Sequence, residues 1–222
     1  MRMRHKKNLD KRIENCEYIV MQKSSSVYRL PEAERYDVIN LKELFDSDNE
    51  VELEIGCGKG GFLVEKAKQN PNVNYLGVEV IGNVLISAGE LAKKSQLKNV
   101  KFLNVGAELL HYILPKNSVS KIYLNFSCPY PKKQYASHRL THENFLNIYK
   151  IIMKNDALII QKTDNDDFFE FSMQSFLDNG FEIVSFTRDL HANMPSDNIL
   201  TEYEAKFSEK GKTINSLTAK LK

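Results

Sequence analysis

The chain has only three cysteines among its 222 residues, Cys16, Cys57 and Cys128, and it contains no Cys-x-x-Cys pair. An odd number of widely separated cysteines supports neither a disulfide framework nor a zinc site, so no metal is expected. Free thiols are typical of a reducing compartment. Long apolar runs are also missing, which argues against a signal peptide and against a membrane span. The sequence therefore predicts a soluble cytoplasmic protein without a metal or a membrane partner.

Acidic residues are scarce in two segments, although the formal net charge of the chain is only +2. Residues 1–12 contain six Lys or Arg and one acid, Asp10. Residues 109–142 contain no Asp or Glu, and their basic residues are Lys116, Lys121, Lys132, Lys133 and Arg139. Basic segments of this kind in a balanced chain indicate a face that meets a polyanion, whereas a solvated charged face is the usual explanation of a short run.

The chain shows no internal repeat, low-complexity segment or domain boundary, so residues 1–222 are expected to form one domain with residues 1–14 as a basic N-terminal arm. Hydrophobic periodicity predicts helices at residues 37–45, 62–69, 82–96, 141–154 and 166–179, with Thr141 as a cap. Strands are predicted at residues 51–55, 73–80, 100–105, 120–126, 157–162, 181–188 and 213–217. This alternation predicts an α/β fold, doubly wound and Rossmann-like, with a mostly parallel seven-stranded sheet and helices on both faces.

A glycine-rich loop follows the first of these strands and precedes a helix, with the spacing Gly56-x-Gly58-x-x-Gly61. Glycines there permit a tight turn and let a ligand approach the backbone at the helix N-terminus. Glu79 ends the next strand, where an acid can accept hydrogen bonds from ribose hydroxyls. The pattern indicates a nucleotide-type cofactor site, the alternative being a tight turn without a ligand.

NAD and S-adenosylmethionine both fit such a loop, so the choice between them depends on other residues. Glu54 lies in the strand before the glycines, where a carboxylate would repel a pyrophosphate but suit a cationic sulfonium or amino group. The one Tyr-x-x-x-Lys match, Tyr112 to Lys116, contains Pro115 and cannot lie on the helix that a dehydrogenase would need. These residues favour S-adenosylmethionine.

The segment 125–133 leaves a predicted buried strand and combines two prolines, Pro129 and Pro131, with two lysines. Proline excludes this loop from a helix or a central strand. Ligands of open α/β sheets bind at the carboxyl ends of strands, so the loop is a candidate site where chemistry and polyanion contact coincide. A surface turn with two solvated lysines is the alternative.

Several short segments together resemble the bacterial tRNA (guanine-N7-)-methyltransferases along almost the whole chain. They are Met1-Arg-Met-Arg-His-Lys6, Glu54-Ile-Gly-Cys-Gly-Lys-Gly60, Tyr75-Leu-Gly-Val-Glu79, Tyr123-Leu-Asn-Phe-Ser127 with Pro129 and Pro131-Lys-Lys133, Lys162-Thr-Asp-Asn165 and Thr201-Glu-Tyr-Glu204. The resemblance implies a class I methyltransferase fold, S-adenosylmethionine as cofactor, and guanine in the variable loop of tRNA as the target. The partner would thus be tRNA, and the protein a monomer or a homodimer.

The resemblance also implies roles for particular residues. Those expected to bind the cofactor are Glu54, Gly56, Gly58, Glu79, Gly106 and Cys128. Those expected to engage the substrate are Lys132, Asp164, Thr201, Glu202, Tyr203 and Glu204. Without the family, the segment 201–204 would be interpreted as a solvated acidic turn or helix start, and Asp164 as a strand-end residue or a helix cap.

Two positions depart from the family pattern. The family usually has Asp where this chain has Cys128, the candidate catalytic residue, and an acid or an amide where it has Gly106. Guanine N7 carries a lone pair and no proton, so methyl transfer needs alignment and no general base. A carboxylate missing at position 128 would then cost about 1–3 kcal/mol of orientation or charge stabilisation. A buried thiol is expected at Cys128, although Lys132 and Lys133 could favour its thiolate.

An active tRNA guanine-N7 methyltransferase is the leading hypothesis from the sequence. A tRNA-binding relative with weak or no catalysis would be consistent with the changes at Gly106 and Cys128. A class I methyltransferase with a protein or small-molecule substrate would fit the glycine loop but would leave the basic segments unexplained.

Overall fold

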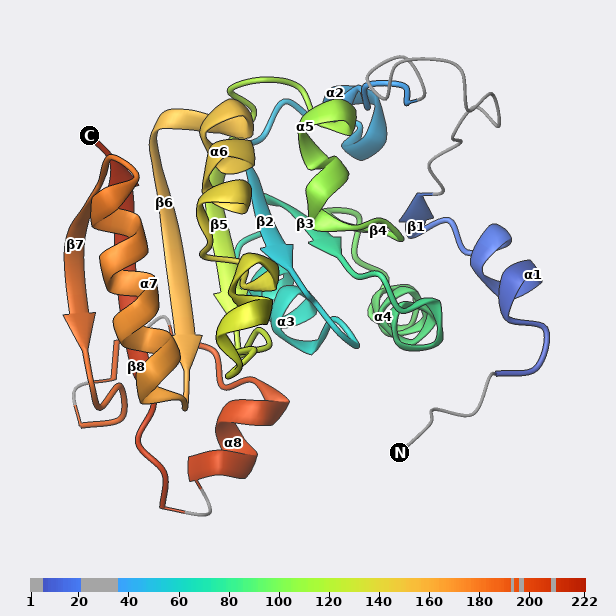
Figure 1. Ribbon diagram of the computed structural model, residues 1–222. Coiled ribbons are helices and arrows are strands. Elements are labelled where there is room, and N and C mark those ends of the chain that lie inside the picture. The colour runs from blue at the N-terminus through green and yellow to red at the C-terminus, as the bar shows by residue number, and fades with distance from the viewer. Residues whose placement is uncertain (1–5, 21–35, 193, 196–197, 209–210) are drawn as a thin grey trace. The chain divides into compact units, whose positions relative to one another are not determined.

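A computed structural model describes residues 6–20, 36–192, 194–195, 198–208 and 211–222 (Figure 1). The segment 1–5 and the serines 24–26 lie outside this range, so the first part of the expected basic arm is not described. The chain divides into two compact units, Met1–Pro115 and Lys116–Lys222. No helix of the described residues is long and apolar enough to cross a membrane.

The first unit contains four parallel strands in the order β1-β4-β3-β2. Its strands are β1 (Ile19–Val20), β2 (Val51–Ile55), β3 (Asn74–Val78) and β4 (Val100–Leu103). Its helices are α1 (Leu9–Glu14), α2 (Leu41–Phe45), α3 (Gly61–Gln69), α4 (Gly82–Lys94), the 3-10 turn η2 (Ala107–Leu109) and α5 (Leu110–Ile113). All five residues of β2 and of β3 are buried, as expected for parallel strands that are covered on both faces.

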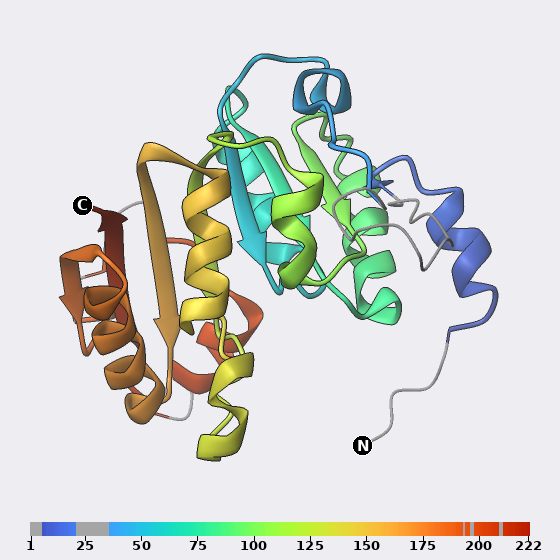
Figure 2. The same cartoon turned by 45° about the horizontal axis from the view of Figure 1, so that its top comes forward.

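The second unit contains β5 (Val119–Asn125), β6 (Met153–Thr163), β7 (Phe181–Thr187) and β8 (Asn215–Leu221) in the order β5-β6-β8-β7. β5 and β6 are parallel, whereas β8 runs antiparallel to both of its neighbours. The remaining elements are the 3-10 helix η3 (Lys133–His138), α6 (Glu143–Ile152), α7 (Asp166–Asp178) and α8 (Glu202–Ser208). Figure 2 shows α7 alongside β7 and β8, and its Phe176 and the first residue of β7, Phe181, are fully buried with ring centroids 5.5 Å apart.

The expected α/β class with a mostly parallel sheet is confirmed, but the described residues form eight strands and not seven. The additional strand is β1, a two-residue strand paired with β4, which is too short to leave a periodic signal. β6 and β8 are also longer than predicted, because β6 extends back to Met153, which pairs with Val119 of β5, and β8 extends to Leu221, which pairs with Phe181 of β7.

Two predicted helix starts are wrong. α6 is capped by His142, whose side chain accepts a hydrogen bond from the Asn144 amide, and not by Thr141. Thr141 is fully buried, with its hydroxyl 2.8 Å from the hydroxyl of Ser172. α2 begins at Leu41 and not at residue 37, because the Asn40 side chain caps it by accepting a hydrogen bond from an amide of the first turn.

Candidate functional site

The glycine loop joins β2 to α3, and its backbone adopts conformations that side chains disfavour. Gly56, Gly58 and Gly60 have φ angles of 80°, 56° and 75°, in the left-handed region that favours glycine. A β-carbon on Gly56 or Gly58 would meet no atom within 4 Å, whereas one on Gly60 would lie 2.7 Å from the β-carbon of Ala88. The predicted third glycine, Gly61, instead begins α3 without a positive φ. Open space beside Gly56 and Gly58 leaves the backbone accessible to a ligand.

Glu79 follows β3 and turns its carboxylate toward this loop. Its Oε2 accepts a hydrogen bond from the Gly58 amide at 3.3 Å, and its Oε1 accepts one from the Ile81 amide at 2.9 Å. The Glu79 backbone is held on the other side by β4, since its amide donates to the Leu103 carbonyl at 3.1 Å. The predicted glycine loop and the predicted acid therefore lie together in the first unit.

The environment of Cys57 places two carboxylates close to the glycine loop. Burial raises the pKa of the Cys57 thiol, and the nearby Glu54 and Glu79 carboxylates raise it further. The thiol is therefore protonated at neutral pH and is no nucleophile. Glu54 itself is buried in β2, at 3% exposure. Two carboxylates near one glycine loop suit a ligand that carries a positive charge.

Gly106, the N-cap of the turn η2, follows β4, the neighbour of β3. Its φ of −77° and ψ of 148° are open to any residue. The space beside it is nevertheless filled, because a β-carbon there would lie 2.1 Å from Oε1 of Glu108. Sequence reasoning did not single out Glu108.

The exit loop of β5 lies in the second unit and is held by an internal cation. Arg139 donates from Nε to the Pro129 carbonyl and from a terminal nitrogen to the Tyr130 carbonyl, both at 3.0 Å. Its guanidinium lies 4.2 Å from the centroid of the Phe171 ring. Arg139 therefore stabilises the loop and does not simply add to a basic face, as the sequence suggested.

The candidate residues of this loop are exposed. Lys132 and Lys133 are exposed at the start of η3, which follows the two prolines. Cys128 is also exposed, so the expected buried thiol is wrong. Phe126 and Tyr130 have φ angles of 52° and 41°, in a region that non-glycine residues rarely adopt. Such strain around Cys128 is typical of functional loops.

Glu204 and Lys162 form a buried ion pair at the start of α8. Lys162 Nζ lies 2.9 Å from Glu204 Oε2, while Oε1 pairs with His191 Nε2 at 3.0 Å and accepts from Asn198 Nδ2 at 2.9 Å. Thr201 Oγ1 accepts a hydrogen bond from the Glu204 amide at 3.0 Å and so caps the helix. Glu204 is therefore an internal anchor of the segment 201–204, not the solvated acid that its sequence context suggests.

Tyr203 lies next to this anchor but is 58% exposed. Its ring makes stacked contacts with the rings of Phe126 and Phe207, with centroid distances of 6.1 and 6.0 Å. Lys212 Nζ lies 4.9 Å from the centroid of the Phe207 ring and 2.9 Å from Oδ2 of Asp164. Asp164 and Tyr203, both predicted from the sequence, are thus connected through an aromatic column, Phe126–Tyr203–Phe207, that the sequence did not reveal. Glu202 begins α8, and its side chain is not among those that the structure describes.

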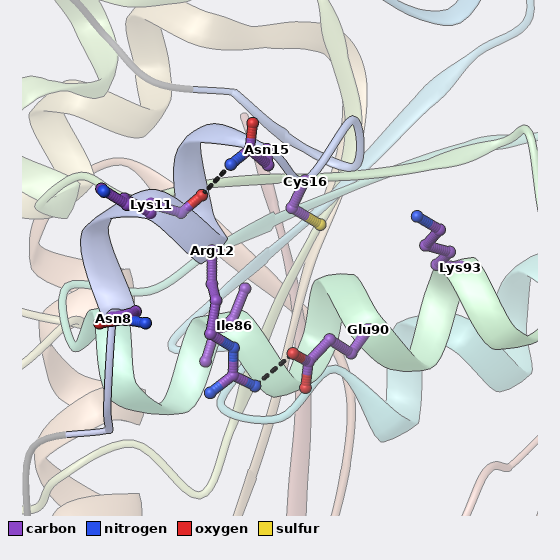
Figure 3. Close-up of a pocket in the computed structure, with 8 residues that line it drawn as sticks. All are labelled: Asn8, Lys11, Arg12, Asn15, Cys16, Ile86, Glu90 and Lys93. Carbon is purple, nitrogen blue, oxygen red and sulfur yellow. Dashed lines mark hydrogen bonds and ion pairs between the residues drawn. The ribbon is translucent and has the colours of Figure 1, made fainter.

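A pocket of about 350 Å³ lies elsewhere, between α1 and α4 (Figure 3). It is lined by Asn8, Lys11, Arg12, Asn15, Cys16, Ile86, Glu90 and Lys93. Arg12 and Glu90 form an ion pair across it. It contains none of the predicted site residues, so the glycine loop remains the better candidate for cofactor chemistry. No group of three or more His, Cys, Asp or Glu in the described part of the chain could hold a metal ion.

Solved structures show which fold this is. The chain matches an antibiotic-related methyltransferase with a TM-score of 0.63 and 18% identity, covering 90% of this chain and 98% of the other. It matches the 16S rRNA methyltransferase KamB with a TM-score of 0.62 and 15% identity, covering 85% and 97%. A 16S rRNA adenine-N1 methyltransferase from Catenulisporales acidiphilia, solved with its cosubstrate SAM, gives a TM-score of 0.60 at 12% identity, covering 86% and 96%. At such identities the similarity establishes the class I methyltransferase fold.

Sequence comparisons identify the family. A family model described as "Putative methyltransferase" matches residues 48–217. A tRNA (guanine-N(7)-)-methyltransferase of Geobacillus kaustophilus is 46% identical over 78% of this chain and 80% of its own length. The proteins of that name from Macrococcus caseolyticus and Bacillus cytotoxicus are 43% and 40% identical, over 82% and 99% of this chain and 86% and 97% of their own lengths. The chain therefore belongs to the tRNA (guanine-N7-)-methyltransferase family.

Proposed function

We propose that this enzyme transfers a methyl group from S-adenosylmethionine to N7 of a guanine in the variable loop of tRNA. The relationship to proteins of that name extends over 99% of the chain in one case, and it carries the proposal. Because both units fall within this relationship, residues 1–222 would act as one methyltransferase domain.

The first unit offers the features that the cofactor requires. Gly56 and Gly58 leave open space beside the backbone, and the Glu79 carboxylate lies at the exit of β3, where it can accept from ribose hydroxyls. Glu54 adds a buried carboxylate suited to the cationic end of the molecule. We assign cofactor binding to Glu54, Gly56, Gly58 and Glu79, with Gly106 as part of the same strand-end region.

The second unit offers the features that a tRNA requires. Lys132 is exposed and carries the charge that phosphates attract. Tyr203 presents an exposed ring already stacked on Phe126, which suits an unstacked base. Asp164 retains 21% exposure of its side chain and could accept hydrogen bonds from a guanine edge. We assign substrate contact to Lys132, Asp164, Thr201 and Tyr203, with Glu202 at the same helix start and Glu204 as their anchor.

The reaction requires alignment more than acid–base chemistry. S-adenosylmethionine supplies a methyl group on a cationic sulfur; the guanine N7 lone pair forms the new C–N bond while the C–S electron pair stays on sulfur. N7 carries no proton, so no side chain has to remove one. Holding the two reactants in line can lower the barrier by about 7–11 kcal/mol. The glycine loop would hold the cofactor, and the exit loop held by Arg139 and the anchored segment 201–204 would hold the tRNA.

The test is a methylation assay with purified protein, S-adenosylmethionine and unmodified tRNA. N7-methylguanosine should appear in the variable loop by nuclease mapping and mass spectrometry, and tRNA affinity should fall as salt rises. Glu79→Ala should mainly weaken S-adenosylhomocysteine binding, and Lys132→Ala should mainly weaken tRNA binding. No methylated product at high enzyme concentration would overturn the proposal.

Cys128 provides a second comparison in the same assay. We propose that residue 128 acts on the cofactor and that a carboxylate there would improve alignment or charge stabilisation. Cys128→Asp should then raise the methylation rate by about 5- to 150-fold, the equivalent of roughly 1–3 kcal/mol. Cys128→Ser should leave the rate near that of the unsubstituted chain. Equal rates for all three would show that position 128 has no part in catalysis.

A further inference from the structure

Gly106 has an ordinary backbone conformation, so conformational freedom does not explain why glycine is here. Its φ of −77° and ψ of 148° suit any residue. A β-carbon at this position would lie 2.1 Å from Oε1 and 2.4 Å from Oε2 of Glu108, closer than real β-carbons come to any such atom. The Glu108 carboxylate therefore occupies the volume that a side chain at residue 106 would fill.

The Glu108 carboxylate lies near the exit of β4, and Glu79 lies at the exit of the neighbouring strand β3. Val78 and Leu103, the last residues of β3 and β4, are register partners in the parallel ladder. The two exits are tied together because Asn104 Nδ2 donates to the Glu79 carbonyl at 2.8 Å. Adjacent carboxyl ends of parallel strands are where open α/β sheets bind their ligands.

The Glu108 side chain is available for a ligand. It is exposed, and it makes no hydrogen bond or ion pair to any residue that the structure describes. Its backbone is held in the turn η2, where the Leu109 amide donates to the Gly106 carbonyl at 3.1 Å and Ala107 is buried. A fixed backbone with an uncommitted carboxylate at its tip can accept hydrogen bonds at a defined place.

We propose that Glu108 is a cofactor-binding residue whose carboxylate accepts a hydrogen bond from the exocyclic amine of the adenine ring. The inference rests on the proposed function, because it takes S-adenosylmethionine as the ligand. With the ribose held by Glu79 just beyond β3, a base directed toward β4 would bring its amine to the η2 turn. A carboxylate only accepts hydrogen bonds, and the adenine amine only donates them, so the two groups are complementary.

The glycine and the glutamate thus form a pair. Gly106 leaves the space, and Glu108, two residues later, fills it with a carboxylate. A side chain at residue 106 would displace Glu108, at little cost to folding because only the end of a flexible side chain has to move. Binding specificity, and not stability, should therefore respond to substitutions at this pair.

The test compares two ligands by calorimetry without tRNA: S-adenosylhomocysteine and S-inosylhomocysteine, which has a carbonyl in place of the amine. The unsubstituted chain should prefer the adenosyl ligand by about 10- to 100-fold, since a charge-assisted hydrogen bond is replaced by repulsion between acceptors. Glu108→Ala should reduce this preference to within about three-fold. Glu108→Gln, whose amide can donate to the carbonyl, should shift the preference toward the inosyl ligand.

Two further variants test the spatial argument. Gly106→Ala should weaken the preference while the carboxylate is still present, because its β-carbon displaces Glu108. The double variant Gly106→Asp with Glu108→Ala should restore part of the preference, because it returns a carboxylate to the same volume. Glu143→Ala, which removes an exposed carboxylate from α6, should leave the preference unchanged.

The outcomes separate this inference from the proposed function. The Glu108→Ala protein could keep its thermal unfolding temperature and still prefer the adenosyl ligand as strongly as the unsubstituted chain. That result would overturn the role of Glu108 and leave the proposed function standing. Absence of any binding by the unsubstituted chain would overturn the proposed cofactor, and this inference with it.

Discussion

Lys162 Nζ lies 2.9 Å from Glu204 Oε2, and the two side chains are only 7% and 0% exposed. This pair connects the end of β6 to the first turn of α8. Lys162 also donates to Asn198 Oδ1 at 2.5 Å and to the Ile199 carbonyl at 3.3 Å, in the segment that precedes α8. A buried ion pair is tolerated when further hydrogen bonds satisfy both partners, as they do here. The position of Tyr203 therefore depends on two charges that are hidden from solvent.

Removal of the buried cation should destabilise the protein strongly. Lys162→Met leaves Glu204 as a buried carboxylate without its main counter-charge, so the free energy of unfolding should fall by about 3–5 kcal/mol. Lys220→Met is the matched control, because Lys220 pairs with Glu182 at 3.0 Å but both side chains are more than 40% exposed. That control should lower the free energy of unfolding, measured with urea, by less than about 1 kcal/mol. Equal losses would show that the buried pair has no special role.

The same pair should make stability depend on acid. Burial raises the pKa of the Glu204 carboxyl, but the charge of Lys162 and the hydrogen bonds from His191, Lys162 and Asn198 outweigh burial and leave the pKa below its ordinary value of 4.5. The carboxylate thus contributes stability above that value, and this contribution is lost as the pH falls through the lower folded-state pKa. Glu204→Gln should lower the urea midpoint of unfolding at pH 7. The difference in urea midpoint between this variant and the unsubstituted chain should become smaller toward pH 3. A difference that does not change with pH would contradict this assignment.

Gly60 should be the least replaceable glycine of the loop. Gly60→Ala forces a side chain into a left-handed conformation and places its β-carbon 2.7 Å from that of Ala88 and 3.0 Å from the Phe102 ring. The cost in unfolding free energy should exceed about 2 kcal/mol, since backbone strain and overpacking add. Gly61→Ala, one residue later, meets nothing within 4 Å and should be tolerated. Thermal unfolding of the two variants side by side measures the difference, and similar melting temperatures would refute it.

Tyr203 should bind RNA through its ring and not through its hydroxyl. Tyr203→Ala should weaken tRNA binding by about 1–3 kcal/mol, the range for stacking of one base, whereas Tyr203→Phe should change it little. Leu177→Ala is a suitable control, because Leu177 is 44% exposed on α7 and lies outside the proposed site. Filter binding at fixed salt measures all three variants. A phenylalanine variant as weak as the alanine variant would assign the contact to the hydroxyl instead.

Local patterns predicted most of the first unit correctly. β2 is found at residues 51–55 as expected, and β3, α4 and β4 differ from their predicted bounds only at their ends. These elements carry strong periodicity and are bounded by glycine and proline, so their signal lies in adjacent residues. The position of Glu79 near the glycine loop could also be predicted, because the loop and Glu79 are separated along the chain by one helix and one strand.

Contacts between distant residues were beyond such patterns. Lys162 and Glu204 are 42 positions apart, and nothing in either local sequence indicates that they pair. Phe126 and Tyr203 lie still farther apart along the chain, and the exposed Cys128 belongs to a loop that Arg139 holds from ten residues beyond Pro129. Segment 201–204 could be predicted as functional only through family resemblance, whereas the prolines and lysines of segment 125–133 already indicated a candidate site at a strand exit.

The sequence by itself determined the alternating α/β elements, the glycine loop and the acid that serves it, because periodicity and glycine placement act over a few residues. The tertiary structure decided which glycine must be glycine, which charges are buried, and where the Glu108 carboxylate lies. These features depend on excluded volume and on desolvation, which are defined only when distant segments pack together.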